Sequence, residues 1–113
     1  MSIIRLRDVS EEESRFPGVT RKSIVVGENL QALQLVMRVG AESTRHRHGR
    51  EQISYCLNGA IEVDIDGQTA ICRAGTMWHV PGGTWHGARA VENSLILETF
   101  SPPIGGEGDW QEP

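Results

Sequence analysis

Three histidines are spaced so that their side chains could meet at one metal ion. His46 and His48 are two residues apart, and residues i and i+2 of an extended segment project from the same face. A third histidine, His86, follows the turn-forming sequence Pro81-Gly82-Gly83. Neutral imidazole is the commonest metal ligand among side chains. A single histidine would be read as an ordinary polar residue, but three in this pattern predict a metal site.

The segments around these histidines are typical of short β-strands. Apolar and polar residues alternate between turn signals, and no stretch keeps a 3.6-residue period. Many short strands at regular spacing indicate an all-β sandwich or barrel. The expected strands are residues 2–9, 21–26, 31–39, 52–57, 60–65, 68–73, 76–80, 86–91 and 94–100.

Two dipeptides, Asn58-Gly59 and Asp66-Gly67, are strong signals for two-residue hairpins. In a hairpin, residues that oppose each other share a face of the sheet. The first turn would therefore place Gln52 on the same face as apolar residues of the next strand. Such a face is suited to the interior, so Gln52 should point toward whatever the histidines hold. The full set on this face is Gln52, Ser54, Cys56, Ile61, Val63, Ile65, Ala70 and Cys72.

The opposite face of residues 52–57 carries Ile53, Tyr55 and Leu57. An apolar outer face needs cover. Either the N-terminal strands or the tail pack over it, or it forms a homodimer interface, which is the interpretation we favour.

Length and composition indicate one domain, residues 1–113, with a core at 20–100 and a Pro- and Gly-rich tail at 101–113 that Trp110 could pin. A net charge of −4 argues against a nucleic-acid partner. No apolar run approaches the roughly 20 residues that a membrane span needs, and the charged N-terminus lacks the apolar core of a signal peptide. We therefore expect a cytoplasmic protein, with Cys56 and Cys72 as buried, reduced thiols.

Two longer motifs resemble those of single-domain cupins. In the first, Gly40 is followed by five residues, His46-Arg47-His48, three residues, Gln52, six residues and Gly59. In the second, Gly75 is followed by five residues, Pro81-Gly82-Gly83, two residues and His86. The resemblance implies a double-stranded β-helix, or jelly-roll, barrel. It also implies one divalent transition metal (Mn, Fe, Ni, Co or Zn), with the ligands His46, His48, Gln52 and His86.

The position of the usual ligand glutamate in cupins holds Gln52 here, and the neighbouring Glu51 should turn away by strand alternation. Three imidazoles and an amide add no negative charge to a divalent ion. The ion would therefore be a stronger Lewis acid, which favours polarisation of a substrate oxygen over oxygen redox chemistry.

Within cupins, the chain is most similar to small pectin-pathway proteins of the KdgF type, on the segments HRHGREQISY and Glu98-Thr99-Phe100-Ser101-Pro102. That resemblance implies conversion of ring-form 4,5-unsaturated uronates to a linear keto form, with Glu98 catalytic and Phe100 in the pocket. Alternation leaves two interpretations open: either Ile96, Glu98 and Phe100 face inward, or Leu95, Leu97 and Thr99 do.

The function predicted is a Lewis-acid and acid–base rearrangement, a ring opening or isomerisation, of a small oxygenated acid. Glu98 would move a proton, and Phe100 and Trp78 would line the pocket. One alternative is a non-haem metal dioxygenase, and another is a non-catalytic module that binds a sugar or small molecule. Arg45 and Arg47 should point away from the metal, and His79 should be structural or at the surface.

Overall fold

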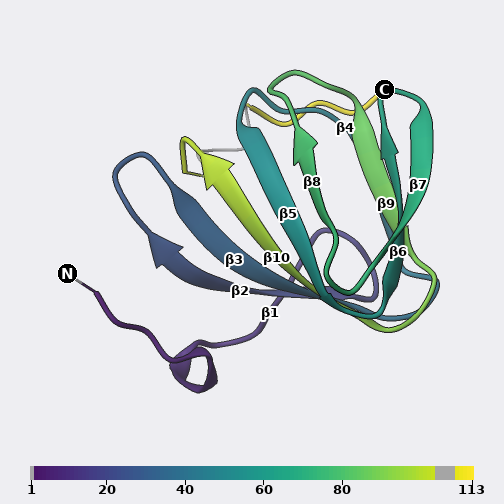
Figure 1. Ribbon diagram of the computed structural model, residues 1–113. Helices are drawn as coiled ribbons and strands as arrows, with labels where there is room; N and C mark the ends of the chain where they lie inside the picture. Colours follow the sequence, from purple (N-terminus) through teal and green to yellow (C-terminus); the bar gives the residue numbers. More distant parts are fainter. Residues whose placement is uncertain (1, 104–108) are drawn as a thin grey trace.

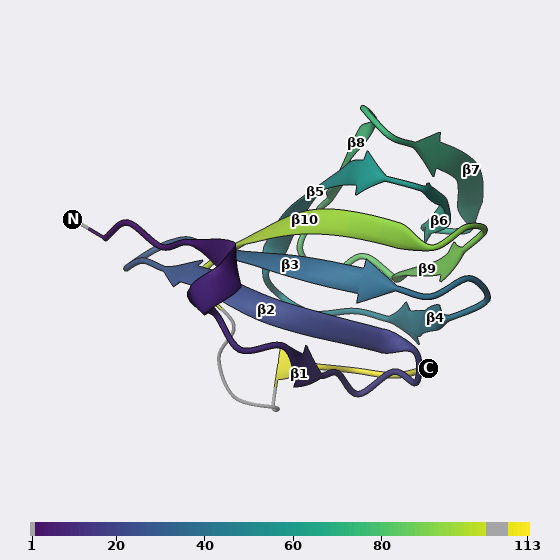
Figure 2. The same cartoon turned by 90° about the horizontal axis from the view of Figure 1, so that it is seen from below.

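The computed structural model describes residues 2–103 and 109–113, and these form two antiparallel β-sheets that face each other (Figure 1). The six-stranded sheet has the order β1-β2-β3-β10-β5-β8, and Figure 2 shows this order along one wall of the barrel. The four-stranded sheet has the order β4-β9-β6-β7. The elements are η1 (Leu6–Asp8), β1 (Glu12–Glu13), β2 (Val19–Val26), β3 (Gln31–Met37), β4 (Glu42–His46), β5 (Glu51–Asn58), β6 (Ala60–Ile65), β7 (Gln68–Arg73), β8 (Met77–Val80), β9 (His86–Ala90) and β10 (Ser94–Ser101). The predicted all-β jelly-roll class is confirmed.

The strand predicted at residues 2–9 is wrong. This segment contains the short 3-10 helix η1, closed by local backbone bonds from Asp8 N to Arg5 O (2.9 Å) and from Val9 N to Leu6 O (3.1 Å). The apolar side chains of this segment are not buried, and Ile3 is 76% exposed. Alternation is a weak signal at a chain end, where no partner strand fixes the extended form.

The predicted hairpin at Asn58-Gly59 is also wrong, because β5 pairs with β8 and β10 while β6 pairs with β7 and β9. The chain instead crosses from one sheet to the other at this turn. Gly59 has φ +92°, and a Cβ there would collide with the carbonyl oxygen of Asn93. The shared inner face still holds for the other residues of the predicted set, which both sheets turn toward the space between them, but Ala70, on the edge strand β7, is exposed. The second hairpin, Asp66-Gly67, is confirmed: Ile65 pairs with Gln68, and both turn residues have positive φ.

The barrel interior is apolar at one end and polar at the other. On β5, Cys56 belongs to the hydrophobic core, whereas Gln52 lies at the polar end. On β10, Ile96 is in the core, and Glu98 follows it toward the polar end. The core thus fixes strand register at one end, and that register aims the polar residues into the other end. The buried core residues are Val19, Met37, Ala41, Cys56, Ile61, Val63, Cys72, Ala90 and Ile96.

The outer face of β5 and β8 is left uncovered by the described residues. Ile53 and Met77 are 43% and 64% exposed. Residues 109–113 do not lie over it; an antiparallel bridge between Arg47 and Gln111 holds them beside the end of β4 (Figure 1). The homodimer therefore stays a prediction. Within the described part of the chain, no helix is long and apolar enough to span a membrane.

Candidate metal centre

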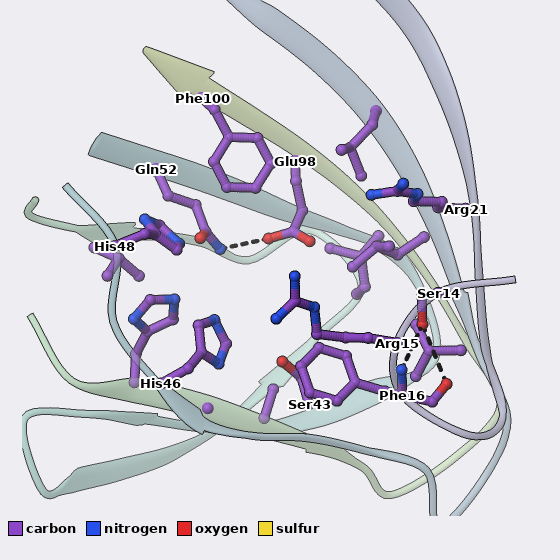
Figure 3. A pocket seen from close by; sticks show the side chains of 18 of the residues that line it. Ser14, Arg15, Phe16, Arg21, Ser43, His46, His48, Gln52, Glu98 and Phe100 are labelled. Atoms are coloured by element: carbon purple, nitrogen blue, oxygen red, sulfur yellow. Dashed lines mark hydrogen bonds between the residues drawn. The ribbon is translucent and has the colours of Figure 1, made fainter. Parts of the chain in front are cut away.

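The three histidines of the two motifs come together inside the polar end of the barrel. His46 ends β4 and pairs with His86, the first residue of β9, while His48 follows β4. One ring nitrogen of each histidine lies within 4.8 Å of the corresponding nitrogens of the other two. All three side chains are buried, with 4–6% of the residue surface exposed. Figure 3 shows His46 and His48 turned into the cavity.

Each of these histidines uses its Nδ1 atom in a hydrogen bond to a backbone carbonyl. The Nδ1–O distances are 2.6 Å from His46 to Thr44, 3.0 Å from His48 to Arg50 and 2.8 Å from His86 to Thr84. A carbonyl oxygen can only accept, so Nδ1 carries the proton and Nε2 presents a lone pair. The Nε2 atom of His86 is buried and has no hydrogen-bond partner among the described residues. Bonds of this kind fix ring orientation in metal sites, so the donor set fits a divalent transition metal.

Burial also keeps these rings neutral. It is the largest cause that lowers the pKa of each histidine, and it lowers the pKa of His46 to about 3. The neighbouring His86 lowers the pKa of His46 and of His48 further. Because a metal binds the unprotonated nitrogen, these rings need lose no proton to bind one at neutral pH.

Gln52 and Glu98 lie on neighbouring strands beside the histidines. The Nε2 group of Gln52 donates to Ser54 Oγ (3.0 Å) and to Glu98 Oε2. The hydroxyl of Ser54 donates to the same oxygen of Glu98 at 3.1 Å. With its nitrogen engaged, Gln52 turns its amide oxygen toward His48 (Figure 3), where it could serve as a fourth ligand.

The structure decides which face of β10 points inward. Ile96 and Phe100 are 2% and 6% exposed, and Glu98 lies between them on the cavity wall. Burial raises the pKa of Glu98 to about 7, and the hydrogen bond from Ser54 offsets only part of this rise. The Oε1 atom of Glu98 accepts no hydrogen bond from the described residues. Glu98 thus presents a free carboxyl oxygen that can change protonation state near neutral pH.

The cavity that these groups line has a volume of about 340 Å³, at the lower end of the range for small-molecule sites. Trp78 and Phe100 form part of its wall, as do Val63 and Ala88. A mixed wall of this kind, with a few polar groups at one end, suits a molecule of about the size of a monosaccharide.

Several residues besides the three histidines and Gln52 also belong to the site. Trp110 stacks on His46, with ring centroids 3.9 Å apart and an interplanar angle of 13°. The guanidinium carbon of Arg15 lies 3.9 Å from the centre of the Trp110 ring. The buried Arg50 pairs with Asp109 at 2.7 Å. Arg50 is two residues after His48, so the sequence already places it beside the histidines. No local signal marks Arg15, because only long-range contacts bring it here; the lone tryptophan of the tail was the one available hint of such a contact.

Other charged and aromatic residues lie away from the cavity. Glu51 and His79 pair on the outer face at 2.7 Å. The guanidinium groups of Arg45 and Arg47 lie 5.5 Å and 4.7 Å from the centre of the Trp85 ring. None of these five residues lines the cavity. Glu51, Arg45 and Arg47 thus point away from it, as strand alternation predicted, and His79 lies at the surface.

Comparison with known proteins agrees with this geometry. The family model "Cupin domain" matches residues 33–100. The chain belongs to the cupin family. It is 32% identical over 97 residues to the pectin degradation protein KdgF of Dickeya dadantii (strain 3937), a match that covers 84% of this chain and 88% of the relative. The predicted KdgF-like resemblance is therefore confirmed.

Solved cupin structures show the same fold. The structure of KdgF from Halomonas sp. has a TM-score of 0.88 and 31% identity, covering 92% of this chain and 96% of that chain. An RmlC-like cupin from Shewanella frigidimarina has a TM-score of 0.83 and 28% identity, covering 93% and 91%. Each match covers more than nine tenths of this chain and of the solved chain.

Proposed function

We propose that this KdgF-like cupin is a metal-dependent enzyme that opens the ring of a small unsaturated uronate and converts it to a linear keto acid. The observation that carries the proposal is the placement of Glu98, with a free carboxyl oxygen, in the same cavity as three histidines whose Nε2 atoms are unprotonated. The name of the Dickeya dadantii relative refers to pectin degradation, which supports a sugar acid as substrate.

The reaction requires two proton movements and no net change in composition. The hydroxyl proton on C1 leaves, and the bond between C1 and the ring oxygen breaks. The ring oxygen keeps the electron pair of that bond as an enolate at C5, which then takes a proton on C4 and becomes a ketone. A bound divalent ion would supply Lewis acidity, polarising a substrate oxygen.

Glu98 is suited to these proton movements because its raised pKa, about 7, lets it accept and donate a proton at neutral pH. Its Oε2 atom is held by Gln52 and Ser54, so the free Oε1 atom has a fixed direction. Fixed direction matters, since a proton is transferred only over hydrogen-bond distance. Gln52 thus has two proposed roles: its nitrogen orients Glu98, and its oxygen completes the metal site.

The walls of the cavity restrict the substrate and exclude water. Phe100 lies with its ring centroid 5.8 Å from that of His48, in an edge-on arrangement. Trp78 and Val80 line the cavity from β8, next to β5. We assign Phe100 and Trp78 to packing against the apolar edge of the sugar ring, a role that aromatic side chains commonly take in ligand pockets.

The test uses unsaturated galacturonate and the metal-loaded protein, with loss of the ultraviolet absorbance of the conjugated double bond as the readout. Wild type should turn over the substrate, and Glu98→Gln should lower kcat by roughly 10²- to 10⁴-fold, the usual contribution of a general acid–base group. Glu51→Gln is the matched control, because Glu51 is on the opposite face of β5; it should leave kcat unchanged. Full turnover in Glu98→Gln would contradict the acid–base role.

A further inference from the structure

The cavity contains a positively charged side chain that the proposed proton chemistry does not use. Arg15 lies in the loop between β1 and β2 and lines the cavity. Figure 3 shows its guanidinium group extended into the cavity, between Glu98 and the histidines. The loop is held by Ser14, whose hydroxyl donates to the carbonyl of Phe16 and accepts from its amide, both at 3.1 Å. Arg15 therefore projects from a locally fixed turn.

Among the residues that the structure describes, Arg15 has no carboxylate partner. The other two arginines of the cavity do: Arg21 lies 4.0 Å from Glu12, and Arg50 lies 2.7 Å from Asp109. Among the described residues, the Arg15 guanidinium makes its close contact with the face of Trp110. Such a contact orients the guanidinium plane but leaves its N–H donors, which lie in that plane, free for a planar anion.

The surroundings favour a negatively charged ligand. The whole chain carries a net charge of −4, yet three arginines line this one cavity, against the two carboxyl groups of Glu13 and Glu98. A divalent ion on neutral histidines would add further positive charge. Field lines are focused in a cavity with low-dielectric walls, so an anion would be drawn into it.

Arg15 and the metal centre share a neighbour in Trp110. The centre of the Trp110 ring lies 3.9 Å from the ring centre of His46 and 3.9 Å from the guanidinium carbon of Arg15. An anion on Arg15 would therefore lie in the same cavity as an oxygen held at the histidines. In a uronate, the carboxylate on C5 and the oxygen on C1 flank the ring oxygen, so one sugar acid could present both groups to this cavity.

From this arrangement we propose that Arg15 is the residue that recognises the carboxylate of the substrate, binding it in a bidentate manner and directing the C1 end of the sugar acid to the metal. Trp110 is the positioning residue that holds the guanidinium in place. The proposal rests on the proposed function for the orientation of the substrate, but the recognition of a carboxylate can be tested without turnover.

The experiment compares binding of D-galacturonate and of D-galactose to the zinc-loaded full chain by NMR titration. The two sugars differ at C6, which is a carboxylate in one and a neutral alcohol in the other. Wild type should bind galacturonate more tightly, and Arg15→Gln should weaken galacturonate by about 10- to 100-fold, the usual effect of losing hydrogen bonds to a charged group. Binding of galactose and the zinc content should stay as in wild type. Arg45→Gln, which removes the same charge outside the cavity, is the control and should bind both sugars as wild type does.

Other results would contradict either the role of Arg15 or the proposed function. A galacturonate preference that survives in Arg15→Gln, or one that is absent from wild type, overturns the proposal. Equal weakening of both sugars in Arg15→Gln assigns Arg15 a structural role and also overturns it. If wild type prefers galacturonate through Arg15 but does not turn over unsaturated galacturonate, then the proposed function fails and carboxylate recognition by Arg15 stands.

Discussion

Replacement of Glu98 by glutamine should change how the stability of the metal-free protein depends on pH. Burial raises the pKa of Glu98 from 4.5 to about 7. Because the folded-state pKa is above the unfolded-state value, the stabilising contribution of the neutral carboxyl is complete below about pH 4.5. It is lost as the pH rises through about 7.

The size of this effect follows from the shift. One pKa unit corresponds to about 1.4 kcal/mol, so the rise from 4.5 to about 7 gives a loss of about 3 kcal/mol at most. Glutamine has a similar shape and cannot ionise, so Glu98→Gln should not show this loss. The free energy of unfolding of the variant, minus that of wild type, should therefore increase by about 3 kcal/mol between acidic and mildly alkaline pH.

The assay is urea unfolding of both proteins across this pH range, after a chelator has removed bound metal so that no cation acts on Glu98. The buried histidines, which gain stability as the pH rises through their ordinary pKa, are common to both proteins and cancel in the difference. Glu28→Gln, at an exposed turn position, is the control and should follow wild type. If the free energies of unfolding of Glu98→Gln and wild type differ by a constant amount across the pH range, the pKa of the Glu98 carboxyl group is not raised by burial.

Three further predictions concern the metal, the loops that hold it and the outer face. Zinc at about 100 times its Kd should raise the Tm of wild type by on the order of 10 °C. His86→Ala should lose this rise in Tm, and His79→Ala should keep it. Equal rises in both variants would contradict the assignment of His86 to the metal site. Gly82→Ala should weaken zinc binding and lower the free energy of unfolding by about 1–3 kcal/mol, because the new Cβ would collide with the carbonyl oxygen of Gly49. Zinc titration measures the first effect and urea unfolding the second. A variant indistinguishable from wild type in both assays would refute the steric argument. Sedimentation should show a dimer that Ile53→Glu converts to a monomer, since Ile53 is 43% exposed on the uncovered face; a wild-type monomer at all concentrations would remove the dimer prediction.

The parts of the site that local spacing determines could be predicted from the sequence. His46 and His48 share a face because of strand alternation, and Pro81-Gly82-Gly83 sets the start of the strand that carries His86. Gln52 was placed on the inner face by a hairpin that does not exist, yet the face is right because alternation along β5 alone determines it.

The remaining features depend on contacts between distant parts of the chain. Leu95-Ile96-Leu97 is apolar at every position, so alternation could not orient Glu98, and pairing with β3 and β5 decides its direction. Arg15 lines the cavity in contact with Trp110, which is 95 positions further along the sequence and stacks on His46. No local pattern encodes such a contact, and the 3-10 helix at Leu6–Asp8 was missed because a chain end has no partner strand to fix its conformation.

Anomalous diffraction at the absorption edge of the metal, from crystals of the metal-loaded protein, tests the central claim most directly. We expect one peak per chain, about 2.1 Å from the Nε2 atoms of His46, His48 and His86, with the amide oxygen of Gln52 as the next ligand. A peak elsewhere in the molecule, or none at the three imidazoles of a protein that retains bound metal, would contradict it.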